Sequence, residues 1–165
     1  MKIALIGFGG MGKVVEAIAL ERGHEVPVIV DPGASENGNS AGMEKSPSGN
    51  SSPGRNFVTK LSAKNLEGVD VAIDFSRADA VLENARICAE AGVNLVVGTT
   101  GWYEKLEEVR KIVGGDDHGL AENLPGTVTQ KENQSAIGFL WSSNFSIGVN
   151  LYFKIVEEAA RLINA

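Results

Sequence analysis

The sequence has 165 residues, of which 43% are hydrophobic and 22% charged, a balance typical of one globular domain of ordinary size. A formal net charge of −6 without a basic stripe argues against a nucleic-acid partner. No stretch approaches the roughly 20 apolar residues that span a bilayer, and the strand predicted directly after Met1 leaves no room for a signal peptide. We therefore expect a cytoplasmic protein without a membrane partner.

The chain opens with a glycine-rich turn between a segment of strand length (2–6) and a segment with helical spacing (13–20). The turn has the spacing G-x-G-x-x-G and consists of Gly7, Phe8, Gly9, Gly10, Met11 and Gly12. In a dinucleotide-binding turn the first glycine permits the bend, the second lets the backbone approach a pyrophosphate, and the third lets the helix pack closely. The sequence therefore predicts a dinucleotide site, with a merely structural strand-to-helix turn as the alternative.

An acidic residue, Asp31, follows the second predicted strand (25–30), 19 residues after Gly12. A carboxylate there can accept hydrogen bonds from both hydroxyls of an adenosine ribose and repels a 2′-phosphate, so Asp31 favours NADH over NADPH. The next residue is Pro32 rather than an arginine that would hold a phosphate. Other candidate sources of positive charge are Lys13, Lys45 and Arg55. The alternative is a strand-ending aspartate in an Asp-Pro-Gly turn.

Two segments interrupt the alternation of strands and helices. Of the 24 residues in 33–56, 17 are Gly, Ser, Asn or Pro, and none is Val, Ile, Leu or aromatic. Such a segment buries too little apolar surface to offset its ordering entropy, which predicts a flexible insertion. A second polar stretch, 114–134, is interpreted as another insertion.

The remaining segments alternate between strand and helix patterns. Further strands are predicted at 57–61, 69–75, 94–97 and 136–141, and further helices at 78–91, 102–113 and 146–163. Ser76 is expected to cap the first of these helices and Gly92 to end it. The alternation predicts an α/β, Rossmann-type fold: a mostly parallel sheet with helices on both faces, which binds ligands beyond the carboxyl ends of its strands.

Two more turns follow predicted strands and supply groups that suit a nicotinamide and its ribose. The first consists of Gly98, Thr99 and Thr100, and the second of Ser142, Ser143, Asn144 and Phe145. A glycine permits close approach of a ring, and hydroxyl and N–H groups can hold an amide or a ribose. Taken singly, each is more often a turn with a helix cap.

One cysteine and two isolated histidines, without ligand-like spacing, predict neither a disulfide nor a metal site. Cys88 stands in a helical pattern and is expected to be a small buried residue.

Four motifs together resemble the 4-hydroxy-tetrahydrodipicolinate (dihydrodipicolinate) reductase family of bacterial lysine and diaminopimelate synthesis. They are residues 7–13, 74–76, 98–101 and 144–150, with a glycine turn one residue shorter than in most members. The resemblance implies that residues 7–12 hold the pyrophosphate of NADH or NADPH and that Asp31 holds the adenosine ribose. It implies that Gly98, Thr99 and Thr100, with the loop from Ser142 to Phe145, hold the nicotinamide end.

The resemblance implies hydride transfer from this cofactor to a ring carbon of a small dicarboxylate substrate. The family continues into a substrate domain with a His-His pair, a lysine and a Pro-Ser-Gly-Thr site, and this chain contains neither that pair nor that site. We therefore expect a dinucleotide-binding domain at 1–145, a helix leading toward the substrate domain at 146–165, no catalytic residue here, and poor turnover by the chain alone. The strongly apolar helix leaves a homo-oligomer possible.

Two alternatives remain open from the sequence. One is a different Rossmann-type nicotinamide enzyme, such as an amino-acid dehydrogenase. The other is an NAD(P)-binding fragment or sensor module without catalysis.

Overall fold

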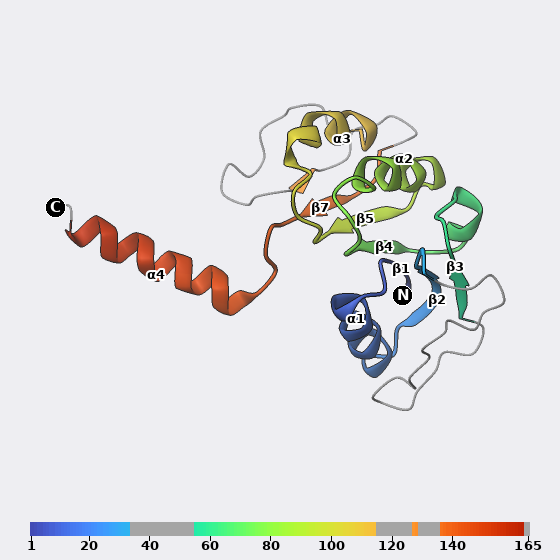
Figure 1. The fold of residues 1–165 in the computed structure, drawn as a ribbon, viewed down its shortest axis with the longest axis horizontal. Coiled ribbons are helices and arrows are strands. Elements are labelled where there is room, and N and C mark those ends of the chain that lie inside the picture. Colours follow the sequence, from blue (N-terminus) through green and yellow to red (C-terminus); the bar gives the residue numbers. More distant parts are fainter. Residues whose placement is uncertain (34–54, 115–126, 129–135, 164–165) are drawn as a thin grey trace.

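The computed structural model describes residues 1–33, 55–114, 127–128 and 136–163, and its centre is a seven-stranded sheet in the order β3-β2-β1-β4-β5-β7-β6 (Figure 1). The strands are β1 (Lys2–Ile6), β2 (Glu25–Val30), β3 (Asn56–Val58), β4 (Val71–Asp74), β5 (Asn94–Val97), β6 (Thr127–Val128) and β7 (Phe139–Trp141). The helices are α1 (Gly10–Glu21), α2 (Val81–Ala91), α3 (Leu106–Ile112) and α4 (Ile147–Ile163), with 3₁₀ turns η1 (Ala63–Leu66) and η2 (Tyr103–Lys105).

Six of the strands run parallel, and β6 pairs with β7 in the antiparallel sense. Strand β1 lies between β2 and β4, so successive strands are added first on one side of β1 and then on the other. This reversal is the topological switch point of an open α/β sheet, where ligands bind. The Rossmann-type fold predicted from the sequence is confirmed.

Helices cover both faces of the sheet, as predicted. Helix α1 packs on one face, where Ala19 joins Leu5 and Ile29 in a buried cluster. Helices α2 and α3 pack on the other face, where Cys88 and Val109 join a larger cluster. Figure 1 shows α1 on the opposite side of the strands from α2 and α3.

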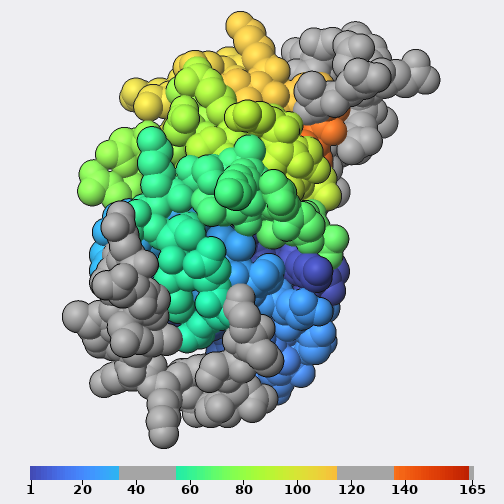
Figure 2. All heavy atoms as spheres, turned by 90° about the vertical axis from the view of Figure 1, so that its right-hand side faces the viewer, coloured from blue at the N-terminus to red at the C-terminus, as the bar shows by residue number. Residues whose placement is uncertain are grey.

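The 3₁₀ turn η1 extends the second face beyond the edge of the sheet. Its Leu66 is buried in the same cluster as the α2 residues, together with Leu61 from the loop after β3. In Figure 2 the atoms coloured for residues near 60 fill the middle of the visible face, between the blue N-terminal residues and the yellow-green residues of α2. The loop after β3 lies beside the loops that follow β1 and β2, because Lys60 lines the same pocket as Gly7 and Asp31.

The glycine turn has the packing predicted for its first and third glycines. Gly7 has a φ of +91°, and a Cβ there would lie 2.5 Å from the carbonyl oxygen of Phe75. A Cβ on Gly12 would collide with the carbonyl oxygen of Gly7. Both positions therefore exclude a side chain, because α1 and the loop after β4 approach the turn at backbone distance.

Several predicted boundaries differ from the structure. Helix α2 begins at Val81 rather than near 78, and Ser76 does not cap it: its N-cap is Ala80, without a side-chain hydrogen bond. The Ser76 hydroxyl instead donates to a buried carboxylate oxygen of Asp74 at 2.6 Å. Gly92 does end the helix, with a φ of 67°.

The other differences concern segment lengths. The predicted helix at 102–113 is divided into η2 and α3, and the predicted strand at 57–61 is the three-residue β3. Of the first predicted insertion (33–56), residues 34–54 lie outside the described residues, as does most of the second (114–134).

A buried ion pair joins α1 to the segment before β3. Arg55 Nη1 lies 2.5 Å from Glu16 Oε1, and both side chains are largely buried. The Arg55 guanidinium also lies over the Phe57 ring, 4.9 Å from its centroid, and Phe57 meets Phe8 of the glycine turn edge to face. Arg55 is therefore engaged in packing rather than available to a 2′-phosphate.

Helix α4 extends away from the sheet (Figure 1), and none of its residues is buried. Among the described residues, no helix combines the length and the apolar character that crossing a membrane requires.

Candidate functional site

The loops that follow the parallel strands meet along one edge of the sheet. Gly7 follows β1, Asp31 follows β2, Phe75 follows β4, Gly98 follows β5 and Ser142 follows β7. The register places the ends of neighbouring strands opposite each other, with Ile6 beside both Val30 and Asp74. The structure therefore brings the predicted site segments to a common edge, the edge at which α/β sheets bind ligands.

The start of α1 has the features of an anion-binding helix terminus. Its N-cap is Gly9, which makes no side-chain cap hydrogen bond, and no acidic residue lies in the first turn. The first N–H groups of a helix have no intrahelical acceptor, and the helix dipole favours negative charge there. A Cβ on Gly9 or Gly10 would meet no atom within 4 Å. This open, uncapped terminus fits a diphosphate.

Beside this terminus lies a pocket of about 400 Å³. Its walls come from the loops after β1, β2, β3 and β4 and from α2, and they include Gly7, Phe8, Gly9, Asp31, Lys60, Ser76, Arg77, Glu83 and Asn84. Gly10, Met11 and Gly12 continue into the first turn of α1 and do not line this pocket.

Asp31 has the features expected of a turn residue and also those expected of a ligand-binding carboxylate. Its Oδ1 accepts a hydrogen bond from the N–H of Gly33 at 3.0 Å, which is the Asp-Pro-Gly turn. Its side chain also lines the pocket, and among the described residues no donor engages Oδ2. The turn therefore orients the carboxylate, and none of the residues that the structure describes donates to its other oxygen.

Two basic residues that sequence reasoning did not single out line the same pocket, Lys60 and Arg77. Arg77 makes two hydrogen bonds to the Asp79 carboxylate, at 3.0 and 3.1 Å, and these bonds lower the pKa of Asp79. Lys60 forms no ion pair with any described residue. Positive charge at the pocket thus comes from the loops after β3 and β4. The motif spacing around Asp31 does not predict these contributions.

A buried polar cluster underlies this edge, and the sequence analysis assigned it no role. Asp74, the last residue of β4, is completely buried. Its Oδ1 accepts hydrogen bonds from the backbone N–H of Ser76 at 2.8 Å and from the Thr99 hydroxyl at 3.0 Å. Its Oδ2 accepts from Asn84 Nδ2 at 2.9 Å. The signal available in the sequence was an aspartate at the end of an otherwise apolar strand pattern.

Hydrogen bonds and packing contacts within the protein fix the turn after β5. Thr99 is buried, and its carbonyl oxygen accepts a hydrogen bond from Trp102 Nε1 at 2.7 Å. A Cβ on Gly98 would collide with the ring of Phe75, so the absence of a side chain here makes room for that ring. Thr100 is exposed and faces solvent. None of the three lines the 400 Å³ pocket.

The loop after β7 has the structure of a turn with helix caps. Ser142 donates through its N–H to the carbonyl oxygen of Val97 at 3.2 Å, which places the loop beside the end of β5. Asn144 Oδ1 accepts from the N–H of Ser146 at 2.7 Å, and Asn144 N–H donates to the Ser142 hydroxyl at 3.2 Å. Ser143 is exposed.

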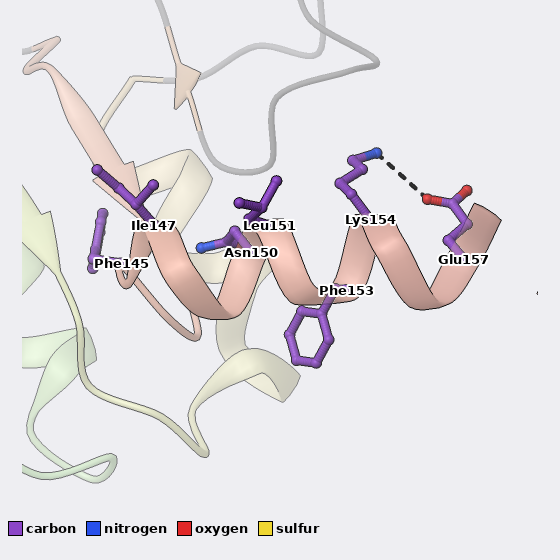
Figure 3. A pocket seen from close by; sticks show the side chains of 7 residues that line it. All are labelled: Phe145, Ile147, Asn150, Leu151, Phe153, Lys154 and Glu157. Carbon is purple, nitrogen blue, oxygen red and sulfur yellow. Dashed lines mark ion pairs between the residues drawn. The ribbon is translucent and has the colours of Figure 1, made fainter. Parts of the chain in front are cut away.

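Phe145 lies with α4 rather than at the sheet edge. Together with Ile147, Leu151 and Phe153 it lines an open hollow of about 540 Å³ on the surface of that helix. Figure 3 shows these side chains on the segment that leads away from the sheet, with Lys154 paired to Glu157 at 3.5 Å. Phe145 therefore lines this hollow and not the 400 Å³ pocket.

The strand order, the switch point and the open glycine turn define a Rossmann-type, dinucleotide-binding class of domain. Comparison with known proteins specifies it further. The family model for "Dihydrodipicolinate reductase, N-terminus" matches residues 1–115, and the chain belongs to this family.

Two reductases with similar sequences agree with this membership. The chain is 35% identical over 164 residues to a 4-hydroxy-tetrahydrodipicolinate reductase of Archaeoglobus fulgidus, covering 99% of this chain and 53% of that protein. It is 37% identical over 108 residues to the Chromobacterium violaceum reductase of the same name, covering 66% of this chain and 33% of that protein. The chain thus spans about half or less of the length of these relatives.

Solved structures support the fold alone. An amine dehydrogenase from Mycobacterium smegmatis superposes with a TM-score of 0.51 at 20% identity, covering 69% of this chain and 36% of that one.

Proposed function

We propose that this chain is the cofactor-binding part of a 4-hydroxy-tetrahydrodipicolinate reductase of lysine and diaminopimelate synthesis, and that it binds NADH in preference to NADPH. The observation that carries the proposal is the uncapped start of α1 beside a pocket lined by Asp31. A helix terminus without a side-chain cap or an acidic first turn suits a diphosphate. A carboxylate with one oxygen that no described residue engages suits a ribose hydroxyl.

The residues of this chain would divide the cofactor between two places. The N–H groups of the first turn of α1 hold the pyrophosphate, and Asp31 with the pocket walls holds the adenosine. The turn from Gly98 to Thr100 and the loop from Ser142 to Phe145 would hold the nicotinamide end. When bound, the cofactor supplies a hydride, and the protein orients it and shields it from water.

We also propose that residues 146–165 lead toward the substrate domain of a complete reductase, and helix α4 supports this. Its polar side chains form one stripe, and its apolar side chains occupy the rest of the circumference without burial. The polar stripe comprises Asn150, Lys154, Glu157, Glu158 and Arg161. So wide an apolar surface needs cover on more than one side. The remaining half of a complete reductase would provide it, with a second copy of this chain as the competing cover.

The first experiment is a titration of the purified chain with NADH and NADPH, followed by calorimetry and nicotinamide fluorescence. We expect saturable binding of NADH, with weaker binding of NADPH. Flat heat and fluorescence up to millimolar cofactor would contradict the proposal. Adding the ring substrate should cause little oxidation of NADH, because no residue of this chain is proposed to contact that substrate.

The second experiment joins this chain to the part of the Archaeoglobus fulgidus reductase that lies outside the matched segment. We expect the chimera to oxidise NADH when the dicarboxylate substrate is added. Ile155→Lys, on the apolar side of α4, should abolish this activity, whereas Lys154→Glu, on the polar stripe, should not. Oxidation that survives Ile155→Lys unchanged would refute the role of α4. A chimera that binds NADH but oxidises it with a 2-oxo acid and ammonia instead would favour an amino-acid dehydrogenase.

A further inference from the structure

The carboxylate of Asp74 joins three segments that the sequence separates. It accepts hydrogen bonds from Ser76 in the loop after β4, from Asn84 on α2, and from Thr99 in the turn after β5. Asp74 is completely buried, so each of these donors replaces water that the carboxylate lost on folding. A buried carboxylate with several charge-assisted hydrogen bonds holds one orientation, because losing any donor leaves part of the charge unsatisfied.

The donors belong to two different parts of the candidate site. Ser76 and Asn84 line the pocket that also contains Asp31. Thr99 lies outside that pocket, and its carbonyl oxygen is held from the other side by Trp102 Nε1. The backbone repeats the connection, since the N–H of Gly98 donates to the carbonyl oxygen of Asp74 at 2.9 Å. Asp74 thus makes hydrogen bonds through its side chain to residues of the pocket and of the turn after β5, and through its main chain to that turn.

We propose that Asp74 is a positioning residue: its carboxylate fixes the turn after β5 relative to the pocket, so that one dinucleotide can contact both. This inference rests on the proposed function, which assigns the adenosine half of the cofactor to the pocket and the nicotinamide end to the turn. A dinucleotide gains affinity from two subsites only when their separation matches its length. If the turn were mobile, part of the binding free energy would be lost in ordering it.

The decisive test uses Thr99 and two ligands, NADH and ADP. Thr99→Val removes the hydroxyl that donates to Asp74 while keeping the shape of the side chain, and Thr99→Ser keeps the hydroxyl. We expect Thr99→Val to weaken NADH binding about tenfold, the size of one lost hydrogen bond to a charged group, and to change ADP binding less than about twofold. ADP lacks the nicotinamide end. Thr99→Ser, which keeps the donor to Asp74, should recover most of the NADH affinity that Thr99→Val loses.

Asp74→Asn extends the test to the other donors. It removes the charge that orients Ser76 and Asn84, so we expect it to weaken ADP as well as NADH. Asn94→Ala is the matched control, since Asn94 Oδ1 accepts a hydrogen bond from Gly138 N–H at 2.8 Å at the opposite end of β5. It should lower stability without changing the ratio of the two affinities. If Asp74→Asn does not fold, the two Thr99 variants still test the positioning role of Asp74.

Equal effects of Thr99→Val on NADH and ADP, or no effect on either, would overturn the positioning role. A wild-type chain that binds neither ligand would instead overturn the proposed function, and this inference with it.

Discussion

The ring of Phe75 fills the space beside Gly98, where a side chain on Gly98 would collide with three atoms of that ring. Phe75 follows β4 and Gly98 follows β5, so the contact joins two loops at the edge of the sheet where the cofactor is proposed to bind. The same Phe75 contacts the glycine turn through its main chain, 2.5 Å from where a Cβ on Gly7 would lie. The loops after β1 and β5 therefore both pack on Phe75 of the loop after β4.

Gly98→Ala is expected to destabilise the fold. The added methyl group overlaps the Phe75 ring, and overpacking of this kind typically costs about 1–3 kcal/mol in the free energy of unfolding. Urea denaturation followed by circular dichroism measures the change. The double variant with Phe75→Leu should recover part of the loss, because the smaller side chain vacates the space. Wild-type stability of Gly98→Ala would show that the two loops separate easily.

Gly9→Ala and Gly12→Ala should separate binding from folding. A Cβ on Gly9 meets no protein atom within 4 Å, so stability should change by less than about 0.5 kcal/mol. The methyl group would stand where the pyrophosphate approaches, so NADH affinity should fall at least about tenfold.

A Cβ on Gly12 collides with the Gly7 carbonyl oxygen, so Gly12→Ala should unfold at a lower urea concentration. Unchanged NADH affinity in folded Gly9→Ala would argue for a merely structural turn.

Asp31→Asn is expected to shift the cofactor preference toward NADPH. The amide keeps an acceptor for the Gly33 N–H but removes the charge that repels a 2′-phosphate. We expect the ratio of NADPH to NADH dissociation constants to fall about tenfold, the effect of one charge at a partly exposed site. Asp70→Asn, at the amino end of β4, changes the net charge equally and should leave the ratio unchanged.

Lys60→Ala should raise the ratio of NADPH to NADH dissociation constants. Lys60 is a cation on the pocket wall that forms no ion pair with the described residues, so its loss should weaken NADPH more than NADH. NADPH binding that is insensitive to this change, measured by the same titrations, would place the 2′-phosphate elsewhere.

Cys88 predicts a loss of stability at high pH. Burial, with a smaller contribution from the charge of Asp74, raises the pKa of this thiol from 9.0 to about 12. Between these values the unfolded chain releases the thiol proton while the native chain retains it, so stability falls as pH rises. The slope approaches about 1.4 kcal/mol per pH unit. Urea denaturation between pH 8 and 10.5 measures it, and Cys88→Ala should remove this part of the slope. Identical slopes for both proteins would contradict the shift.

The sequence by itself determined the elements that depend on local pattern. Apolar runs predicted β1 and β2 at their observed bounds. Glycines marked the turn before α1 and the end of α2, because the positive φ at Gly7 and Gly92 favours glycine. The motif spacing also placed Gly7, Asp31 and Gly98 after strands, and parallel strands necessarily bring such positions to one edge.

Tertiary structure alone decided which side chains face one another. It turned Ser76 from a helix cap into a donor to Asp74, filled the space at Gly98 with Phe75, and placed Lys60 and Arg77 on the pocket wall. These contacts join residues that are distant in sequence, and their partners depend on strand order and register, which a local pattern does not encode. For the same reason the sequence showed that α4 is apolar, whereas the structure showed that the described residues leave it uncovered.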